Sequence, residues 1–301
     1  MTRGDHRPCD ARVVVLGHSG FLGAEILLRL RQADVNAEGI SSAQCDLLDM
    51  EQVAEYFSGV TGRFQVVFCA ARTRQRGQSF DSMTQNIRMI QNFLHAVPRQ
   101  QLDSVVYLSS VDVYGSHPKL PISENSPSRP HNSYGISKLC GEYLLALPGL
   151  ESCPAAILRL PGVYGSGDQA LSVVGRLFQQ MCRDGRVKIV GDGRVRRDFL
   201  EVGDLCSVVR RVLEQPFTGT LNIVTGQSIT VIELVHMLSA ATRLSPAIEF
   251  VDADSQQVGD LIFDATAMRS RFPDLQLMPV QHGIAKYIST STLMEDMDRH
   301  G

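Results

Sequence analysis

The sequence predicts an α/β protein: a doubly wound parallel-sheet domain followed by a smaller mixed α/β lobe. Short apolar segments of strand character alternate with amphipathic helical segments, a glycine-rich turn joins the first strand to the first helix, and the pattern changes after about Gly165. Strands that are apolar throughout belong to sheets covered by helices on both faces. We therefore place one domain at residues 11–165 and a second at residues 166–301, with residues 205–225 rejoining the first sheet.

The elements of the first domain follow from hydrophobic periodicity. Arg12–Leu16 is a β-branched run, and the helical segment after it carries Ile26, Leu27 and Leu30. The remaining predicted strands are Val35–Ile40, which is weakly marked, Gln65–Ala71, Ser104–Ser110 and Ala155–Leu160. The predicted helices are Ala24–Gln32, Met50–Phe57, Asp81–Val97 and Tyr134–Leu147.

The second half of the chain has a different character. Its predicted elements are a helix at Leu171–Arg183, a strand at Val187–Val190, a turn at Gly191-Asp192-Gly193, a strand at Thr220–Val224 that rejoins the main sheet, and a helix at Thr230–Thr242. We expect this lobe to bind substrate against the carboxyl edge of the sheet, where open α/β folds bind ligands.

Composition excludes several classes of protein. The chain has 301 residues, 44% hydrophobic and 20% charged, with a net charge of -3, which gives no basic surface for nucleic acid. Its seven cysteines are scattered without metal-ligand spacing, so we expect reduced thiols and no metal site. An apolar leader and an apolar run of about 18 residues are both lacking, so no membrane association is expected and a cytoplasmic location is predicted.

The turn after the first strand has the pattern Gly17-x-x-Gly20-x-x-Gly23. Gly17 permits the tight turn, Gly20 lets the backbone approach a pyrophosphate, and Gly23 lets the helix pack closely on the sheet. The pyrophosphate would rest on the helix N-terminus, attracted by its amide groups and dipole. With a strand before it and a helix after it, this turn predicts a dinucleotide-binding Rossmann domain.

The residues past the glycines indicate which dinucleotide. The position that holds the ribose hydroxyls of NAD, about 20 residues on, falls at Ser41-Ser42, and neither residue is acidic. Two hydroxyls and the His18 imidazole tolerate a 2′-phosphate, which favours NADP over NAD, although no arginine stands there to clamp it. Asp46-Leu47 would lie near the adenine; the alternative for Asp46 is a cap of the following helix.

Tyr134 and Lys138 are four residues apart, on one face of a predicted helix. A nearby cation favours the phenolate and lowers a tyrosine pKa, which suits proton exchange with a carbonyl or alcohol oxygen. Ser110 ends an apolar strand, at the sheet edge where such folds carry chemistry, and its hydroxyl can bind the same oxygen. The three residues predict hydride-transfer chemistry with the dinucleotide.

The motifs together resemble a known family. They are Gly17-x-x-Gly20-x-x-Gly23, Ser109-Ser110-Val-Asp-Val-Tyr114-Gly115, Tyr134-x-x-x-Lys138, Leu158-Arg159-Leu-Pro-Gly-Val-Tyr164-Gly165 and Arg197-Asp198-Phe199-Leu-Glu-Val-x-Asp204. The chain resembles the extended short-chain dehydrogenase/reductases, and more narrowly the NAD-dependent epimerase/dehydratase family acting on nucleotide sugars, from about residue 12 to 285.

The resemblance implies roles for individual residues. Tyr134 would be the acid/base, Lys138 would lower its pKa and hold the nicotinamide ribose, and Ser110 would polarise the substrate oxygen. Arg197 would pair with a substrate phosphate, a surface position on a turn being the alternative. Contacts to the dinucleotide would come from Gly17, Ser19, Gly20, Phe21, Leu22, Gly23, Ser41, Ser42, Asp46, Leu47, Cys69, Ala70, Ala71, Asn86, Tyr134, Lys138 and Pro161.

The chain departs from the family pattern at three places. Gly162 stands where the family usually has an asparagine and Gln257 where it has an arginine, both of which normally contact the sugar nucleotide. Asp112 stands where dehydratases have a glutamate base, and Val111 where they have an acid, which disfavours 4,6-dehydration. A turn or capping role is the alternative for Asp112.

The preferred function is NAD(P)-dependent oxidoreduction at C4 of a nucleotide sugar, as a 4-epimerase or a 4-ketoreductase. A dehydratase that uses Asp112 as its base is the alternative, and a non-catalytic dinucleotide-binding sensor is disfavoured because Ser110, Tyr134 and Lys138 are all present. The resemblance also implies a homodimer formed through the helices at residues 81–97 and 134–147.

Overall fold

The computed structural model describes residues 12–73, 79–147, 153–252 and 259–291. The chain forms two compact units, the first made of Met1–Val113, Pro130–Arg159 and Leu205–Leu221, and the second of Tyr114–Arg129, Leu160–Asp204 and Asn222–Gly301. The sequence placed residues 11–165 in the first domain, with residues 205–225 rejoining its sheet. In the structure, residues 114–129 and 160–165 group with the second unit instead.

The first unit is built on a six-stranded sheet with the order β10-β5-β4-β3-β1-β2. Its strands are β1 (Arg12–Leu16), β2 (Ala37–Ile40), β3 (Phe64–Phe68), β4 (Leu102–Ser110), β5 (Ala155–Leu160) and β10 (Gly219–Asn222). β1 pairs in parallel with β2 on one side and with β3 on the other, and β3 pairs in parallel with β4. The predicted α/β class with a mainly parallel sheet is confirmed. The strand order reverses between β1 and β3, because β2 lies on one side of β1 and β3 to β5 lie on the other, and such a switch point is where these sheets bind ligands.

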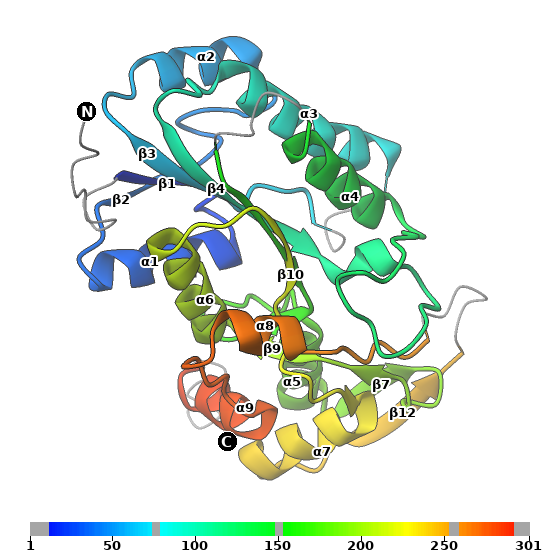
Figure 1. Cartoon of the computed structure of the whole chain (residues 1–301). Coiled ribbons are helices and arrows are strands. Elements are labelled where there is room, and N and C mark those ends of the chain that lie inside the picture. The colour runs from blue at the N-terminus through cyan, green and yellow to red at the C-terminus, as the bar shows by residue number, and fades with distance from the viewer. Residues whose placement is uncertain (1–11, 74–78, 148–152, 253–258, 292–301) are drawn as a thin grey trace. The chain divides into compact units, whose positions relative to one another are not determined.

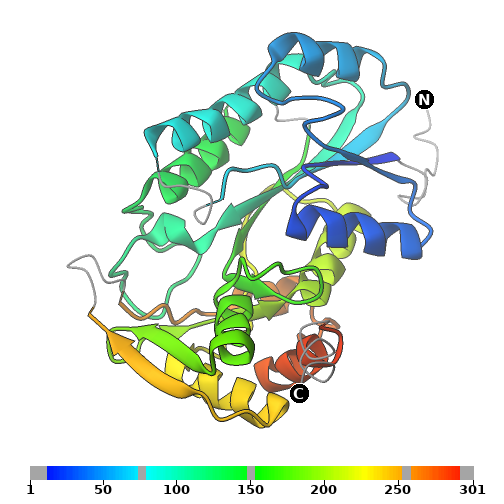
Figure 2. The same ribbon diagram turned by 180° about the vertical axis from the view of Figure 1, so that it is seen from behind.

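Helices cover both faces of this sheet, as Figures 1 and 2 show, with α2, α3 and α4 on one face and α1 and α6 on the other. These helices are α1 (Phe21–Gln32), α2 (Met50–Ser58), α3 (Phe80–Ala96), α4 (Ser133–Leu145) and α6 (Val202–Glu214). Every residue of β3 is buried, which explains why four of its five residues are apolar and do not alternate with polar ones; the fifth, Gln65, donates to Ser104 Oγ and to the Leu213 carbonyl. The core on the α2–α4 face contains Phe57, Phe68, Phe93 and Tyr107.

Capping side chains set where several helices begin. Asp49 accepts from the amides of Glu51 and Gln52 at the start of α2, and Ser79 accepts from Ser82 at the start of α3. In α1 the N-cap is Gly20, and among the described residues no side chain caps this helix. The sequence placed the start of α1 three residues late because a glycine cap gives no side-chain signal.

The second unit contains three pairs of short strands. The parallel pairs are β6 (Gly162–Tyr164) with β9 (Phe199–Glu201) and β7 (Arg186–Val190) with β12 (Ala247–Val251), and the antiparallel pair is β8 (Arg196–Arg197) with β11 (Ile229–Thr230). Its helices are α5 (Val173–Asp184), α7 (Val231–Thr242), α8 (Thr266–Arg271) and α9 (Val280–Ser289). The predicted mixed α/β lobe is therefore present, although β6, β8, β9, β11, β12, α8 and α9 were not predicted.

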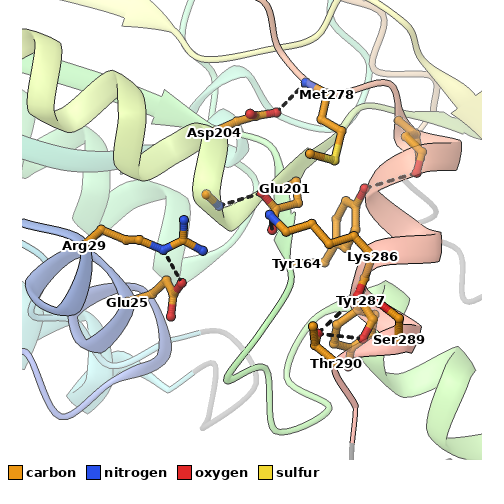
Figure 3. Close-up of polar contacts among 12 residues, drawn as sticks. Glu25, Arg29, Tyr164, Glu201, Asp204, Met278, Lys286, Tyr287, Ser289 and Thr290 are labelled. Atoms are coloured by element: carbon orange, nitrogen blue, oxygen red, sulfur yellow. Dashed lines mark hydrogen bonds and ion pairs between the residues drawn. The ribbon is translucent and has the colours of Figure 1, made fainter. Parts of the chain in front are cut away.

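Buried acidic residues attach α9 to the rest of the second unit (Figure 3). Glu201, only 3% exposed, pairs with Lys286 at 3.2 Å and accepts from the amide of Gly203 at 2.8 Å. Asp204 accepts from the amide of Met278 at 2.7 Å, and burial raises the pKa of its carboxyl group. These contacts hold the ends of β9 and α9 together.

Two further features bear on the predicted location and redox state. None of the described helices is long and apolar enough to cross a membrane. Six of the seven cysteines lie in the described part of the chain, and none of these six forms a disulfide.

Candidate active site

The turn between β1 and α1 is a close-packed loop that requires two of its three glycines. Gly17 has φ +86°, and a Cβ there would come 2.7 Å from the Cα of Ala70. A Cβ on Gly23 would come 2.4 Å from the carbonyl oxygen of Gly17. A Cβ on Gly20 would meet nothing nearer than that oxygen, at 3.5 Å. The loop itself thus tolerates a side chain at position 20, so glycine there suits a ligand that approaches the backbone closely.

The start of α1 offers amide donors to such a ligand. Ser19 and Gly20 are exposed, and Phe21 and Leu22 open the helix with no acidic residue in its first turn. The first amides of a helix have no intrahelical partner, and the helix dipole favours an anion beside them. Together with the glycine loop, these residues fit the pyrophosphate of a dinucleotide.

The corner after β2 carries polar groups but no carboxylate over residues 39–44. The amide of Gly17 donates to the carbonyl of Ile40 at 2.8 Å, which brings the glycine loop beside Ser41. The Ser41 amide donates to Gln44 Oε1 at 2.9 Å, whereas Ser42 is exposed. The His18 ring lies against Gly39, and its Nδ1 is buried with no hydrogen-bond partner among the described residues. Hydroxyl, amide and imidazole groups therefore surround the turn after β2, in place of a carboxylate.

Asp46 and Leu47 both take part in local structure. Asp46 Oδ1 accepts from the amide of Leu48 at 3.0 Å, whereas Asp49 caps α2, so the alternative role of Asp46 as the helix cap is wrong. The Leu47 side chain is buried, and its carbonyl accepts from Asn92 Nδ2 at 2.9 Å. A contact of either residue with the adenine stays a prediction.

The segment Cys69–Ala71 passes directly under the glycine loop after β3 ends. Asn86 of α3 fixes it: Oδ1 accepts from the Arg72 amide at 2.7 Å, and Nδ2 donates to the Arg72 carbonyl and to Ser137 Oγ, both at 3.1 Å. One amide side chain thus links the end of β3 to the helix that carries Tyr134 and Lys138. Desolvation raises the pKa of Cys69 to about 12, so its thiol stays protonated.

The ends of β4 and the start of α4 are packed together closely. Asn132 caps α4 by accepting from the Gly135 amide at 2.7 Å, and a Cβ on Gly135 would come 2.7 Å from the carbonyl oxygen of Asp112. Ser110 is 9% exposed at the end of β4, and its hydroxyl accepts from the Asp112 amide at 3.1 Å. Glycine at position 135 therefore lets the helix of Tyr134 approach the residues that follow Ser110.

Lys138 is buried between α4 and β4, only 3% exposed. Its ammonium group donates to the carbonyl of Leu108 at 2.7 Å and lies 5.7 Å from the centroid of the Tyr134 ring. Burial lowers the pKa of Lys138 to about 8, against the opposing charge of Glu142. Ser110, Tyr134 and Lys138 thus come from one strand end and one helix start, in the unit that also carries the glycine loop.

One more turn along α4 lies a buried ion pair that sequence reasoning missed. Glu142 accepts from Arg159 of β5 at 3.0 and 2.7 Å and from the Ser109 hydroxyl at 2.5 Å. All three side chains are at most 6% exposed. The pair ties α4 to the ends of β4 and β5, and the spacing Tyr134, Lys138, Glu142 was the signal that could have revealed it.

The remaining predicted residues belong to the second unit or lie outside the described residues. Gly162 opens β6 after Pro161, and a Cβ there would come 3.2 Å from the Phe199 ring, which gives a packing reason for glycine in place of asparagine. Arg197 Nη1 donates to the carbonyls of Arg196 and Gly259, each at 2.7 Å. Gln257 lies outside the described residues.

A family model with the description "NAD dependent epimerase/dehydratase family" matches residues 13–224. Among curated relatives, the uncharacterized UDP-glucose epimerase YtcB of Bacillus subtilis is 29% identical over 56% of this chain and 54% of its own length. The dTDP-4-dehydro-6-deoxy-D-allose reductase of a Streptomyces species is 28% identical over 263 residues, covering 76% of this chain and 80% of that protein. The chain thus spans about half the length of the first relative and most of the second.

Solved structures share the fold over nearly the whole chain. The UDP-glucose 4-epimerase of Thermotoga maritima with UDP-glucose superposes with a TM-score of 0.85 at 21% identity, covering 92% of this chain and 97% of that one. RMD from Pseudomonas aeruginosa complexed with NADPH has a TM-score of 0.79 at 23% identity, covering 92% and 98%. At this identity the likeness establishes a Rossmann-like fold.

Proposed function

The chain belongs to the NAD dependent epimerase/dehydratase family, and from that premise we propose that it reduces a 4-keto nucleotide sugar with NADPH. The observation that supports the chemistry is the grouping of Ser110, Tyr134 and Lys138 on one unit with the glycine loop. The corner after β2, which lacks a carboxylate, supports NADPH. A 4-epimerase is the second candidate, favoured by the UDP-glucose epimerase names of two similar proteins.

The proposed mechanism assigns one task to each side chain. When bound, the nicotinamide supplies the hydride that reduces the keto carbon. Tyr134 gives its phenolic proton to the oxygen of that carbon, and Ser110 donates a hydrogen bond to the same oxygen. Lys138, held by the Leu108 carbonyl, places a positive charge beside Tyr134 that favours loss of this proton. The same three residues run the reverse step in an epimerase.

The reaction is tested by offering the purified protein two sets of compounds. One set contains 4-keto-6-deoxy nucleotide sugars with NADPH, and the other UDP-glucose and UDP-galactose with NAD. We expect oxidation of NADPH and a 4-hydroxy product by NMR with the first set. Interconversion of the second set without net cofactor turnover would establish the epimerase instead, and conversion of neither set would contradict both candidates.

Dehydration is a weaker alternative for a structural reason. Val111, where dehydratases carry an acid, is buried and 6% exposed, so it belongs to the core. The Asp112 amide donates to Ser110, which ties this residue to a turn at the strand end. Asp112 would have to act as base without an acid partner at position 111.

Ser41 provides the test of cofactor preference. We expect wild-type protein to bind NADPH more tightly than NADH by fluorescence titration. Ser41→Asp places a carboxylate beside the glycine loop, where repulsion of a 2′-phosphate should weaken NADPH binding about tenfold or more. NADH binding by the same variant is the internal control and should not weaken. A wild-type protein that prefers NADH would contradict the proposal.

Two further assignments concern the substrate phosphate and the oligomeric state. We propose that Arg197 pairs with a substrate phosphate through its guanidinium group, which its two carbonyl contacts hold in place.

We also propose a homodimer formed through α3 and α4, which leave Phe80, Ile136 and Tyr143 exposed by 80%, 43% and 66%. Sedimentation equilibrium that shows a monomer at micromolar concentration would exclude this dimer.

A further inference from the structure

The ring of Tyr107 lies against the ammonium group of Lys138. Tyr107 is on β4 and 4% exposed, and Lys138 Nζ is 4.9 Å from the centroid of its ring. The same ammonium group donates to the carbonyl of Leu108, the next residue of the strand, at 2.7 Å. Two consecutive residues of β4 therefore stabilise the positive charge of Lys138: Leu108 through its carbonyl oxygen and Tyr107 through the face of its ring.

Gly141 on α4 makes room for this arrangement. A Cβ at position 141 would come 2.3 Å from the Tyr107 hydroxyl oxygen and 2.7 Å from the ring carbon that bears it. The ring also packs against Phe68, with centroids 5.8 Å apart. Burial raises the pKa of Tyr107 well above its ordinary value, so its phenol keeps its proton. The ammonium group of Lys138 lies over the face of this neutral ring.

The ionisable groups near Lys138 come from three strands or strand ends and from α4. Cys69 follows β3, Tyr107 lies on β4, and Tyr134 and Glu142 lie on α4, with Arg159 of β5 bound to Glu142. Desolvation disfavours the charged form of a buried lysine. A carbonyl, an aromatic face and the Glu142 carboxylate act in the opposite direction.

We propose that Tyr107 is a positioning residue: the face of its ring holds Lys138 as a cation beside Tyr134. This inference rests on the proposed roles of Tyr134 and Lys138. Removal of the ring leaves Lys138 less well stabilised as a cation, so more of it is neutral at working pH. Tyr134 then loses its neighbouring positive charge, and its phenol releases its proton at a higher pH.

The chain is well suited to a direct measurement, because it contains seven tyrosines and no tryptophan. The near-ultraviolet absorbance of tyrosinate, recorded during a pH titration of the protein alone, reports phenolate formation. Each variant is titrated with and without Tyr134→Phe, and the difference isolates Tyr134. Burial raises the pKa of four other tyrosines, Tyr56, Tyr107, Tyr164 and Tyr287, which moves their signals to higher pH.

Tyr107→Leu should raise the Tyr134 midpoint by about one pH unit, toward the value in Lys138→Met, which removes the cation altogether. Tyr107→Phe keeps the ring and loses only the hydroxyl, so it should titrate like wild type. A wild-type midpoint in Tyr107→Leu, or an equal rise in Tyr107→Phe, would overturn the role of the ring. A wild-type midpoint in Lys138→Met would instead overturn the proposed catalytic pair, and this inference with it.

Gly141→Ala is the second variant, in case the leucine substitution prevents folding. Its methyl group overlaps the Tyr107 hydroxyl and pushes the ring aside without removing any side chain. The Tyr134 midpoint should again rise. An unshifted midpoint in folded Gly141→Ala protein would overturn the inference.

Discussion

Tyr134→Phe is expected to lower turnover by about 10²- to 10⁴-fold, the usual contribution of a positioned general acid. The substitution removes the phenolic proton and leaves the ring, whose centroid lies 5.7 Å from Lys138 Nζ. Binding of NADPH, measured by its fluorescence, should change less than about threefold. The quantity to compare is kcat with the substrate that the product assay identifies.

Tyr143→Phe is the matched control. Tyr143 lies on the same helix, 66% exposed, and loses the same hydroxyl, so its kcat should equal that of the wild type. Full activity of Tyr134→Phe would refute the assignment of the acid. Equal losses in both variants would show instead that phenol removal disturbs α4 as a whole.

Turnover should depend on pH in one direction, which the ionisation of Lys138 sets. The pKa of Lys138 is lowered to about 8, so its positive charge is present below that pH and is lost as the pH rises through it. Turnover should therefore fall on the alkaline side of about pH 8, because Tyr134 loses the cation that favours its phenolate. A rate that stays level well above this pH would contradict a role for the Lys138 charge.

The second large effect is expected at the glycine loop. Gly23→Ala places a methyl group 2.4 Å from the Gly17 carbonyl oxygen and 2.9 Å from two other backbone atoms. The loop and α1 must separate, which should lower the free energy of unfolding by about 1–3 kcal/mol and weaken NADPH binding by about two orders of magnitude, because displaced amides no longer meet the pyrophosphate. Denaturant titration and NADPH fluorescence measure the two effects.

Gly20→Ala distinguishes an effect on ligand binding from an effect on folding stability. A methyl group there has open space, with the nearest atom at 3.5 Å, and the backbone at φ -87° accepts alanine. The free energy of unfolding should change by less than about 1 kcal/mol, the loss of a helix-cap preference. NADPH binding should nevertheless weaken at least about tenfold. Unaltered binding would show that the pyrophosphate does not lie against this residue.

Much of the first unit could be predicted because its signals are local. β1, α2 and β4 follow from runs and periodicities within a few residues, and the glycine spacing marks the turn after β1. The predicted β3 extended to Ala71, but the strand ends at Phe68, since Cys69–Ala71 leave the sheet to pass under the glycine loop. That course depends on a contact with Gly17, more than 50 residues away in the sequence, which no local pattern encodes.

The second unit was harder to predict for the same reason. β12 is exposed along most of its length, so it lacks the apolar pattern of a buried strand. The sequence placed residues 205–225 with the first sheet, and residues 205–221 do group with the first unit, but it did not predict that residues 114–129 group with the second unit. The unit to which such a segment belongs depends on long-range packing, which no local sequence pattern encodes.

The sequence by itself determined the fold class and the family, and it predicted the chemistry of the reacting groups, because the glycine turn and the Tyr134/Lys138 spacing are local motifs with a direct physical meaning. Only the tertiary structure decided the surroundings of those groups. It placed Lys138 against the Tyr107 ring and the Leu108 carbonyl, and it paired Glu142 with Arg159. The physical reason is burial: the charge of a lysine depends on which distant residues replace its water, and folding alone brings those residues together.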